Sequence, residues 1–310
     1  MLALVLLFAC HRHEAADDSA SDVVDLRGEF PDAPTEGQQW LTPDITIPAY
    51  TEKQYCYFLE YDGEDVGITS VDTYQSQYGH HVLMLESTAS EDEHPNGSLF
   101  DCTDADDLIM TAVEPIIYGP IVAVDGVSQY SLPEGMGARL NSGTRIVLQS
   151  HYVNTSADDI LVHDAINLGY APEDEIETWT APIVNTGIDF TLPAGEQTSV
   201  ELDCAIEAEG DLLFLTGHMH EWGSAITVDH QTAEGTSRIY EVPSWMPEYR
   251  DVPPFQDYVG APYHVSVGDH FITTCTWFNT EDHDMTFPEE MCAAFGMFYP
   301  SKVPLICTPF

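Results

Sequence analysis

Two histidines separated by a single residue, His218 and His220, follow the apolar run Leu212-Leu213-Phe214-Leu215. The run is typical of a buried strand, and side chains at positions i and i+2 of a strand point to the same face. Two imidazoles on one face of a rigid strand can bind one metal ion, and Met291 could join them. Three further histidines on strand-like segments complete a prediction of two copper sites: His80, His81 and His151.

The types of these residues favour copper. Neutral imidazole binds copper, zinc and iron, and the thioether of Met291 adds a preference for Cu(I). His80 and His81 are adjacent, so on a regular strand they face opposite ways. Both can bind one ion only at a bulge or through different ring nitrogens, with His151 completing a three-histidine site. Taken singly, a histidine or methionine on a strand is more often structural, so the prediction depends on the whole group.

The segments that must position these residues are short apolar runs separated by Gly, Pro, Asn and Asp, from Trp40 onward. Long helical periodicity is nearly absent, so the sequence predicts an all-β fold of the sandwich or barrel class. The polar stretch 171–175 predicts a boundary between two domains of similar size, 40–175 and 176–310. Residues 11–39 are rich in Asp, Glu, Ala, Ser and Pro, and we expect a disordered acidic linker there.

The charge of the chain narrows the classes of partner. Eight Lys and Arg residues stand against 53 Asp and Glu residues, a formal net charge of −45. We expect neither nucleic acid nor an anionic membrane surface as a partner, because polyanions repel such a chain. The charge fits a solvated acidic shell suited to salty surroundings, where counterions screen self-repulsion, or alternatively the capture of cations.

Residues 1–10 are apolar and end in Leu7-Phe8-Ala9-Cys10. The stretch is too short to span a bilayer and is similar to the apolar part of a signal peptide that ends in a bacterial lipobox, with Cys10 as the lipidated residue. A plain signal peptide with an incidental cysteine is the alternative, and the positively charged start of a signal peptide is missing here. Either way we expect an exported protein, with a lipid anchor as its sole membrane contact. Removing Cys10 from the seven cysteines leaves six, which predicts three disulfides with 15 possible connectivities.

The order His-His, His-Tyr, His-x-His and Glu-Met-Cys resembles that of the copper type II, ascorbate-dependent monooxygenases, which include the peptidylglycine α-hydroxylating and dopamine β-monooxygenases. The resemblance spans Trp40 to Cys307 and implies two tandem jelly-roll-like antiparallel β-sandwich domains. It implies an electron-transfer copper in the first domain and an oxygen-binding copper in the second, with these ligands: His80, His81 and His151 for the former, and His218, His220 and Met291 for the latter.

The resemblance also implies a disulfide pairing in which each bridge stays inside one domain: Cys56–Cys102, Cys204–Cys307 and Cys275–Cys292. It offers no counterpart to Cys10, which favours lipidation of that residue. The implied activity is hydroxylation of a C–H bond in a small organic substrate, with O2 and an external reductant such as ascorbate. His218, His220 and Met291 would be the catalytic ligands.

Three positions depart from the peptide-hydroxylating members of the family. Thr216 stands where those members have an arginine that holds the substrate carboxylate, and Ala293 and Phe295 stand where they have an asparagine and a tyrosine. A buried carboxylate without these contacts is costly. We therefore expect a neutral or cationic substrate with an apolar body in place of a glycine-extended peptide.

Two other functions compete with a monooxygenase. One is a copper-binding or copper-buffering surface lipoprotein that has the ligands but no turnover, which the acidic charge and the lost substrate contacts favour. The other is a zinc hydrolase, because His-x-His also serves zinc chemistry. The hydrolase lacks a carboxylate base in a fitting motif and leaves Met291 without a purpose.

Overall fold

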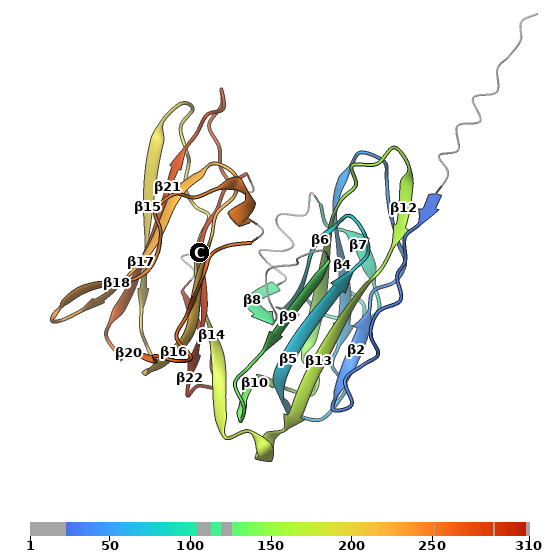
Figure 1. The fold of residues 1–310 in the computed structure, drawn as a ribbon, viewed down its shortest axis with the longest axis horizontal. Coiled ribbons are helices and arrows are strands. Elements are labelled where there is room, and N and C mark those ends of the chain that lie inside the picture. The colour runs from blue at the N-terminus through green and yellow to red at the C-terminus, as the bar shows by residue number, and fades with distance from the viewer. Residues whose placement is uncertain (1–22, 104–112, 119–125, 251, 288, 308–310) are drawn as a thin grey trace, which may run out of the picture.

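The computed structural model describes residues 23–103, 113–118, 126–250, 252–287 and 289–307. These residues form two lobes built almost entirely of strands (Figure 1). Each lobe is a jelly-roll-like sandwich of two sheets whose neighbouring strands are mostly antiparallel. The predicted fold class, all-β with two tandem sandwiches, is confirmed.

Two layers and a small third sheet make up the N-terminal lobe. One layer contains β9 (Val127–Ser131), β10 (Met136–Leu140), β5 (Val66–Gln75), β13 (Asp164–Pro172) and β2 (Gly37–Leu41). The facing layer contains β7 (Leu99–Asp101), β4 (Glu52–Glu60), β11 (Arg145–Val153), β6 (Gly79–Ser87) and β8 (Val113–Tyr118). The small sheet contains β1 (Val23–Asp25), β12 (Asp159–Val162) and β3 (Ile45–Ile47).

The C-terminal lobe repeats the two-layer plan. Its inner layer, on the side of the other lobe, contains β14 (Thr178–Gly187), β22 (Cys292–Tyr299), β16 (Gly210–His218), β19 (Phe255–Asp257), β20 (Tyr263–Val265) and β23 (Leu305–Cys307). Its outer layer contains β15 (Gln197–Ala205), β21 (His270–Phe278), β17 (Gly223–Thr232) and β18 (Gly235–Val242).

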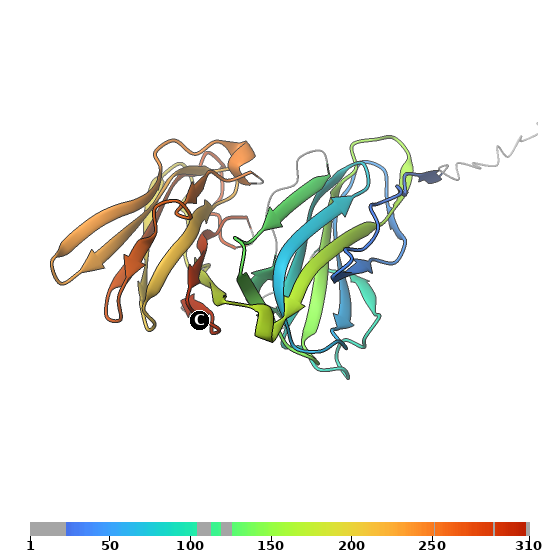
Figure 2. The same cartoon turned by 60° about the horizontal axis from the view of Figure 1, so that its bottom comes forward.

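The chain passes between the lobes at the short 3₁₀ helix η1 (Glu173–Glu175), within the stretch where the sequence predicts a domain boundary. Directly beside it, β10 pairs in parallel with β14, so one 11-stranded sheet continues through both lobes. Figure 2 shows this yellow-green connection at the base of the two lobes. A second 3₁₀ helix, η2 (Pro247–Arg250), follows β18.

Each lobe has its own apolar core between its layers. The N-terminal core includes Met84, Leu148 and Ile166, and the C-terminal core includes Leu215 and Met219. The alternation of a strand explains what lies on the other side of the C-terminal inner layer. Because Leu215 and Met219 point into the core, the residues between them at even positions point out of it, toward the N-terminal lobe.

The three disulfides are Cys56–Cys102, Cys204–Cys307 and Cys275–Cys292, as the resemblance implies. The first staples the N-terminal lobe, and the other two each join the two layers of the C-terminal sandwich. Such bridges are consistent with a protein outside the reducing cytosol. Among the described residues, no helix is long and apolar enough to cross a membrane.

The structure differs from the predicted linker over residues 11–39. From residue 23 on, the chain belongs to the fold, because β1 pairs in parallel with β12 and β2 pairs with β13. The composition predicted disorder because large apolar side chains are scarce there. Backbone pairing with the lobe supplies the stabilisation that the composition does not reveal. Residues 1–22, with the predicted signal segment 1–10 and Cys10, lie outside the described residues.

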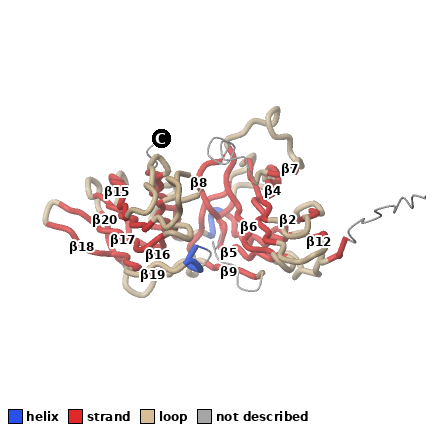
Figure 3. The backbone as a smooth tube through the Cα atoms, turned by 90° about the horizontal axis from the view of Figure 1, so that it is seen from above, coloured by secondary structure: helices blue, strands red, loops and turns tan. Residues whose placement is uncertain are grey.

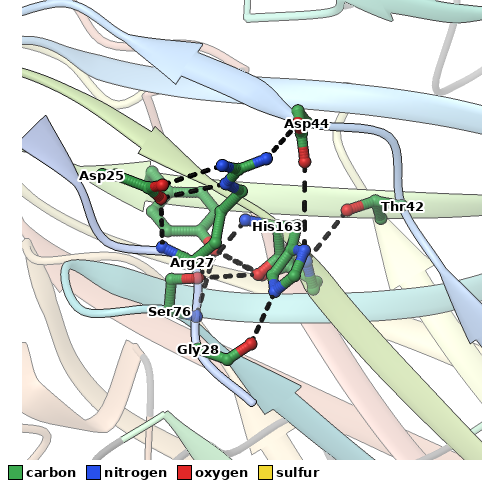
Figure 4. A network of polar contacts seen from close by, with 9 residues as sticks. Asp25, Arg27, Gly28, Thr42, Asp44, Ser76 and His163 are labelled. Atoms are coloured by element: carbon green, nitrogen blue, oxygen red, sulfur yellow. Dashed lines mark hydrogen bonds and ion pairs between the residues drawn. The ribbon is translucent and has the colours of Figure 1, made fainter. Parts of the chain in front are cut away.

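Polar contacts hold the same N-terminal segment against the lobe (Figure 4). Arg27 forms ion pairs with Asp25 at 2.8 Å and with Asp44 at 2.6 Å. The Nε2–H of His163 donates to the carbonyl oxygen of Gly28 at 2.9 Å. Arg27 and Gly28 belong to the segment, whereas Asp44 and His163 belong to the lobe. The docking of the segment therefore depends on the folded lobe.

Candidate metal sites

The first site lies where β6 and β11 pair in the N-terminal lobe. His81 is opposite His151 in this ladder, whereas the next pair joins Gly79 to Tyr152, so His80 is the extra residue of a β-bulge. A bulge redirects a side chain relative to the regular alternation, which is one of the two conditions under which His80 and His81 can share an ion. One ring nitrogen from each of the three histidines lies within 4.8 Å of the others. The structure therefore brings the three rings together.

The ring of His151 is held by a carboxylate. Its Nε2–H donates to Glu52 Oε1 at 2.8 Å, while its buried Nδ1 has no hydrogen-bond partner among the described residues. The hydrogen bond from His151 lowers the pKa of Glu52 to about 2, so Glu52 is ionised and accepts only. A carboxylate that accepts from one ring nitrogen fixes the tautomer and leaves the lone pair on the other. The Nδ1 lone pair of His151 is therefore presented to the site.

Two histidines of this site, His81 and His151, are neutral. Burial lowers the pKa of His151, although the hydrogen bond to Glu52 acts in the opposite direction. Burial also lowers the pKa of His81 well below its ordinary value, and the charges of His151, His80 and His218 add to the effect. Metal binding requires deprotonated ligands, so burial prepares these rings for a metal ion.

The second site lies at the end of β16 in the C-terminal lobe. In the pairing of β16 with β22, Gly217 is opposite Ala294 and His218 is opposite Ala293. Continued by two residues, this register sets His220 opposite Met291. Residues directly opposite in an antiparallel pair share a face of the sheet. His218 therefore lies on the face of the inner layer that points away from the core, and the ring of His220, just beyond the end of β16, has its centroid 5.2 Å from that of His218. Met291 directly precedes β22.

The two rings of this site have different partners. The Nδ1–H of His220 donates to the carbonyl oxygen of Glu289 at 2.9 Å, which leaves the ring lone pair on Nε2. The buried Nδ1 of His218 has no hydrogen-bond partner in the part of the chain that the structure describes. Burial lowers the pKa of His218 to about 3, and the charges of His220 and Arg250 act in the same direction. Both the tautomer of His220 and the neutral state of His218 suit metal ligation.

Glu290 ties the backbone around the second site together. Its Oε2 accepts from the backbone N–H of His220 at 2.9 Å, from that of Met291 at 3.3 Å, and from Trp277 Nε1 at 2.8 Å. Its Oε1 accepts from the N–H of Trp222 at 2.9 Å. Burial raises the pKa of Glu290 to about 7, and the four N–H donors act against this shift. One buried carboxyl thus fixes His220 and Met291 relative to each other.

The three positions that depart from the peptide-hydroxylating enzymes lie beside this site. Thr216 is opposite Phe295 and His218 is opposite Ala293, so all four share one face of β16 and β22. The ring centroids of His218 and Phe295 are 6.5 Å apart. Thr216 donates its hydroxyl proton to the carbonyl oxygen of Pro254 at 3.0 Å, so its polar group is occupied. The surface next to His218 is consequently apolar and aromatic.

Both sites lie at the ends of their lobes that are remote from η1. In the N-terminal lobe, β5 runs from Val66 near η1 to Gln75, whose Nε2 donates to the carbonyl oxygen of His81 at 3.0 Å. In the C-terminal lobe, β14 runs from Thr178 beside η1 to Gly187, which pairs with Cys292. Each strand covers nine steps, or roughly 30 Å. Figure 3 shows the two lobes side by side from above, and at this end Arg250 Nη2 of one lobe lies 3.4 Å from Glu52 Oε1 of the other.

Sequence reasoning missed three residues of these sites. Glu52 lies 99 positions before His151, and an acid at a strand start carries no sign of its distant partner. Glu290 belongs to the Glu-Met-Cys motif, but its burial and its four N–H donors depend on the folded lobe. Arg250 follows an irregular stretch and contacts Glu52 across the lobes at 3.4 Å.

No family model and no curated protein matches the chain. Among solved structures, the major capsid protein P2 of bacteriophage PM2 has 10% sequence identity and a TM-score of 0.33, covering 86% of this chain and 99% of that one. The VP2 subviral particle of infectious bursal disease virus has 9% identity and a TM-score of 0.23, covering 89% of this chain and 74% of that one. Neither likeness bears on the activity of this chain.

Proposed function

We propose that the chain is an exported dicopper monooxygenase that hydroxylates a C–H bond of a small organic molecule, using O2 and an ascorbate-like reductant. The observation that carries the proposal is a pair of buried imidazole nitrogens, Nδ1 of His151 and Nδ1 of His218, without hydrogen-bond partners among the described residues. A buried polar atom normally has a partner. Each of these two nitrogens lies within a group of candidate metal ligands, and a metal ion is a partner that satisfies a neutral imidazole lone pair.

The residues of the two sites would act differently. His80, His81 and His151 form an all-nitrogen set, with Glu52 orienting the ring of His151. Met291, which directly precedes β22, would be the third, weak ligand beside His218 and His220. Copper bound there would supply the one-electron chemistry that activates dioxygen toward a C–H bond, while the reductant provides two electrons and one oxygen atom leaves as water.

The choice of copper over zinc depends on the second site. A thioether favours Cu(I) over zinc. A zinc hydrolase also needs a general base, and the nearby buried carboxyl Glu290 already accepts four N–H hydrogen bonds. With both oxygens of Glu290 engaged in this way, that carboxyl is a poor candidate for activating water.

The substrate would bind against the aromatic face beside His218. Phe214 stacks on Phe255 with ring centroids 4.8 Å apart, and Tyr130 of the other lobe approaches Phe214 to 5.7 Å. Asp257 is paired opposite Phe214 and supplies a carboxylate at this end of the face. The aromatic rings suit a molecule with an apolar body. The nearby carboxylate favours a neutral or cationic molecule, because Thr216 offers no positive charge to hold an anionic one.

Metal analysis combined with oxygen uptake tests the proposal. The mature protein, reconstituted with Cu(I) without oxygen, should bind two coppers per chain and consume O2 when ascorbate and a C–H donor are present. His218→Ala should abolish oxygen uptake and lose one copper. His151→Ala should lose the other copper and slow turnover, because delivery of the second electron becomes slow. Loss of both coppers in either variant would contradict two separate sites. Two bound coppers without any oxygen uptake would instead support the copper-buffering alternative.

Export would begin with residues 1–10, and Cys10 would carry a lipid anchor. Mass spectrometry of the protein purified from its native membranes tests this directly. A diacylglycerol-modified Cys10 at the mature N-terminus supports the anchor, whereas cleavage elsewhere with an unmodified cysteine supports a plain signal peptide.

A further inference from the structure

One arginine connects the two lobes at the end where both histidine sites lie. Arg250, the last residue of η2, directs Nη2 to Glu52 Oε1 of the N-terminal lobe at 3.4 Å, and its Nη1 donates to Glu221 Oε1 of its own lobe. Glu52 also accepts from His151, and Glu221 directly follows His220. A continuous polar chain therefore runs from the first site to the second through a single guanidinium group.

The other contacts between the described residues of the two lobes lie nearer η1, among them the rings of Tyr130 and Phe214 partway along the lobes, with centroids 5.7 Å apart. The pairing of β10 with β14 is next to η1, and Lys302 pairs with Glu173 of η1 at 3.6 Å. Ile306 packs against the core of the N-terminal lobe. Figure 1 shows the lobes joined at η1 and diverging above it, with the orange turn of η2 on the side that faces the other lobe. The lobes are thus anchored at the base, and Arg250 acts at the opposite end.

Charge makes this contact more important than an ordinary surface ion pair. The chain has eight Lys and Arg residues against 53 Asp and Glu residues. Without a cation between them, Glu52 and Glu221 are two carboxylates that repel across the gap between the lobes. The planar guanidinium offers separate N–H groups to two carboxylates at once, which an ammonium group on a flexible stem matches less well.

We propose that Arg250 is a positioning residue that clamps the two lobes together at the metal-site end by pairing with Glu52 of one lobe and Glu221 of the other. The clamp itself is a property of the protein without metal. Its consequence rests on the proposed function: the clamp sets how far an electron must travel from the three-histidine site to the site of His218 and His220.

Small-angle X-ray scattering of the metal-free chain tests the clamp. Arg250→Gln should increase the radius of gyration and the largest dimension of the protein. Wild type and variant are compared at the same low ionic strength, because salt screens both the ion pairs of Arg250 and the repulsion between the acidic lobes. Arg250→Lys should restore the compact form in part. The matched control is Arg238→Gln. Arg238 pairs with Asp229 and Glu241 inside the β17–β18 hairpin, so this substitution removes the same charge without affecting a contact to the other lobe.

Turnover of the copper-loaded protein gives the second readout. Arg250→Gln should lower kcat by roughly tenfold to a hundredfold, as expected for a small misplacement of reacting groups, with unchanged KM and unchanged copper content. Arg238→Gln should leave all three unchanged.

Scattering of Arg250→Gln that superimposes on the wild type would overturn the clamp whatever the activity. Expansion of this variant in a protein that shows no copper-dependent turnover would support the clamp and refute the monooxygenase. If Arg250→Gln fails to fold, Glu221→Gln takes its place, because it removes the carboxylate that Arg250 pairs with in its own lobe. Scattering of Glu221→Gln that superimposes on the wild type then refutes the clamp.

Discussion

Removing the carboxylate of Glu52 should weaken metal binding at the three-histidine site and leave the other site intact. Glu52 Oε1 accepts from His151 Nε2–H at 2.8 Å, and this contact leaves the ring lone pair on the unpartnered Nδ1 of His151. In Glu52→Ala the ring loses its partner and can rotate or change tautomer. In Glu52→Gln a neutral carbonyl oxygen still accepts from Nε2–H, and the charge alone is lost.

The magnitude follows from the type of contact and its exposure. Loss of an outer partner of a ligating histidine typically costs about 10–100-fold in metal affinity, or about 1.4–2.8 kcal/mol. The Glu52 side chain is 52% exposed, so water screens part of its charge. We therefore expect about a tenfold loss for Glu52→Ala. Since a neutral hydrogen bond retains about half the strength of a charge-assisted one, Glu52→Gln should lose about threefold.

Competition between the protein and a Cu(I) chelator measures the affinity of each site. His218→Ala serves as the background, so that the three-histidine site is read alone. Glu60→Ala is the matched control, because Glu60 is an exposed acid at the other end of the same strand. Arg250→Gln separates the two contacts of Glu52, since it breaks the pairing with Arg250 and keeps the one with His151. Equal Cu(I) affinity in Glu52→Ala and Glu60→Ala would refute the orienting contribution of Glu52.

Three further outcomes are expected. X-ray absorption of the Cu(I) protein should show one sulfur scatterer per two coppers, and Met291→Ile should abolish it without loss of the three-histidine copper; a persisting sulfur signal excludes Met291 as a ligand. Burial raises the pKa of Asp164 from 3.8 to about 6, so its stabilising contribution is complete below about pH 4 and is lost as the pH rises through about 6. In chemical denaturation, the free energy of unfolding of the wild type should therefore fall by about 3 kcal/mol relative to that of Asp164→Asn between those limits. A difference that does not vary with pH would contradict the raised pKa of Asp164. Because Thr216 and Phe295 replace groups that would hold a carboxylate, turnover of a phenethylamine should exceed that of an acyl-glycine and of a glycine-extended peptide, and faster turnover of the glycine compounds would show that these positions have been misread.

The pattern of the sequence determined the features that depend on one strand at a time. Apolar runs with turn residues between them predicted an all-β fold, because strand alternation and turn chemistry are local properties. The spacing of His218 and His220 predicted two neighbouring imidazoles, and their ring centroids are 5.2 Å apart although β16 ends at His218. The disulfides Cys56–Cys102, Cys204–Cys307 and Cys275–Cys292 agree with the family resemblance, whereas residue counting alone left 15 connectivities.

Only the tertiary structure decided what depends on two strands or two lobes together. The sequence left two ways for His80 and His81 to share an ion, and the register of β6 against β11 selected the bulge, since a bulge exists only relative to a partner strand. The docking of residues 23–39 likewise requires the folded lobe as a template. Glu52 and Arg250 look like ordinary surface charges in the sequence, and they acquire their partners because folding brings together residues that are 198 positions apart.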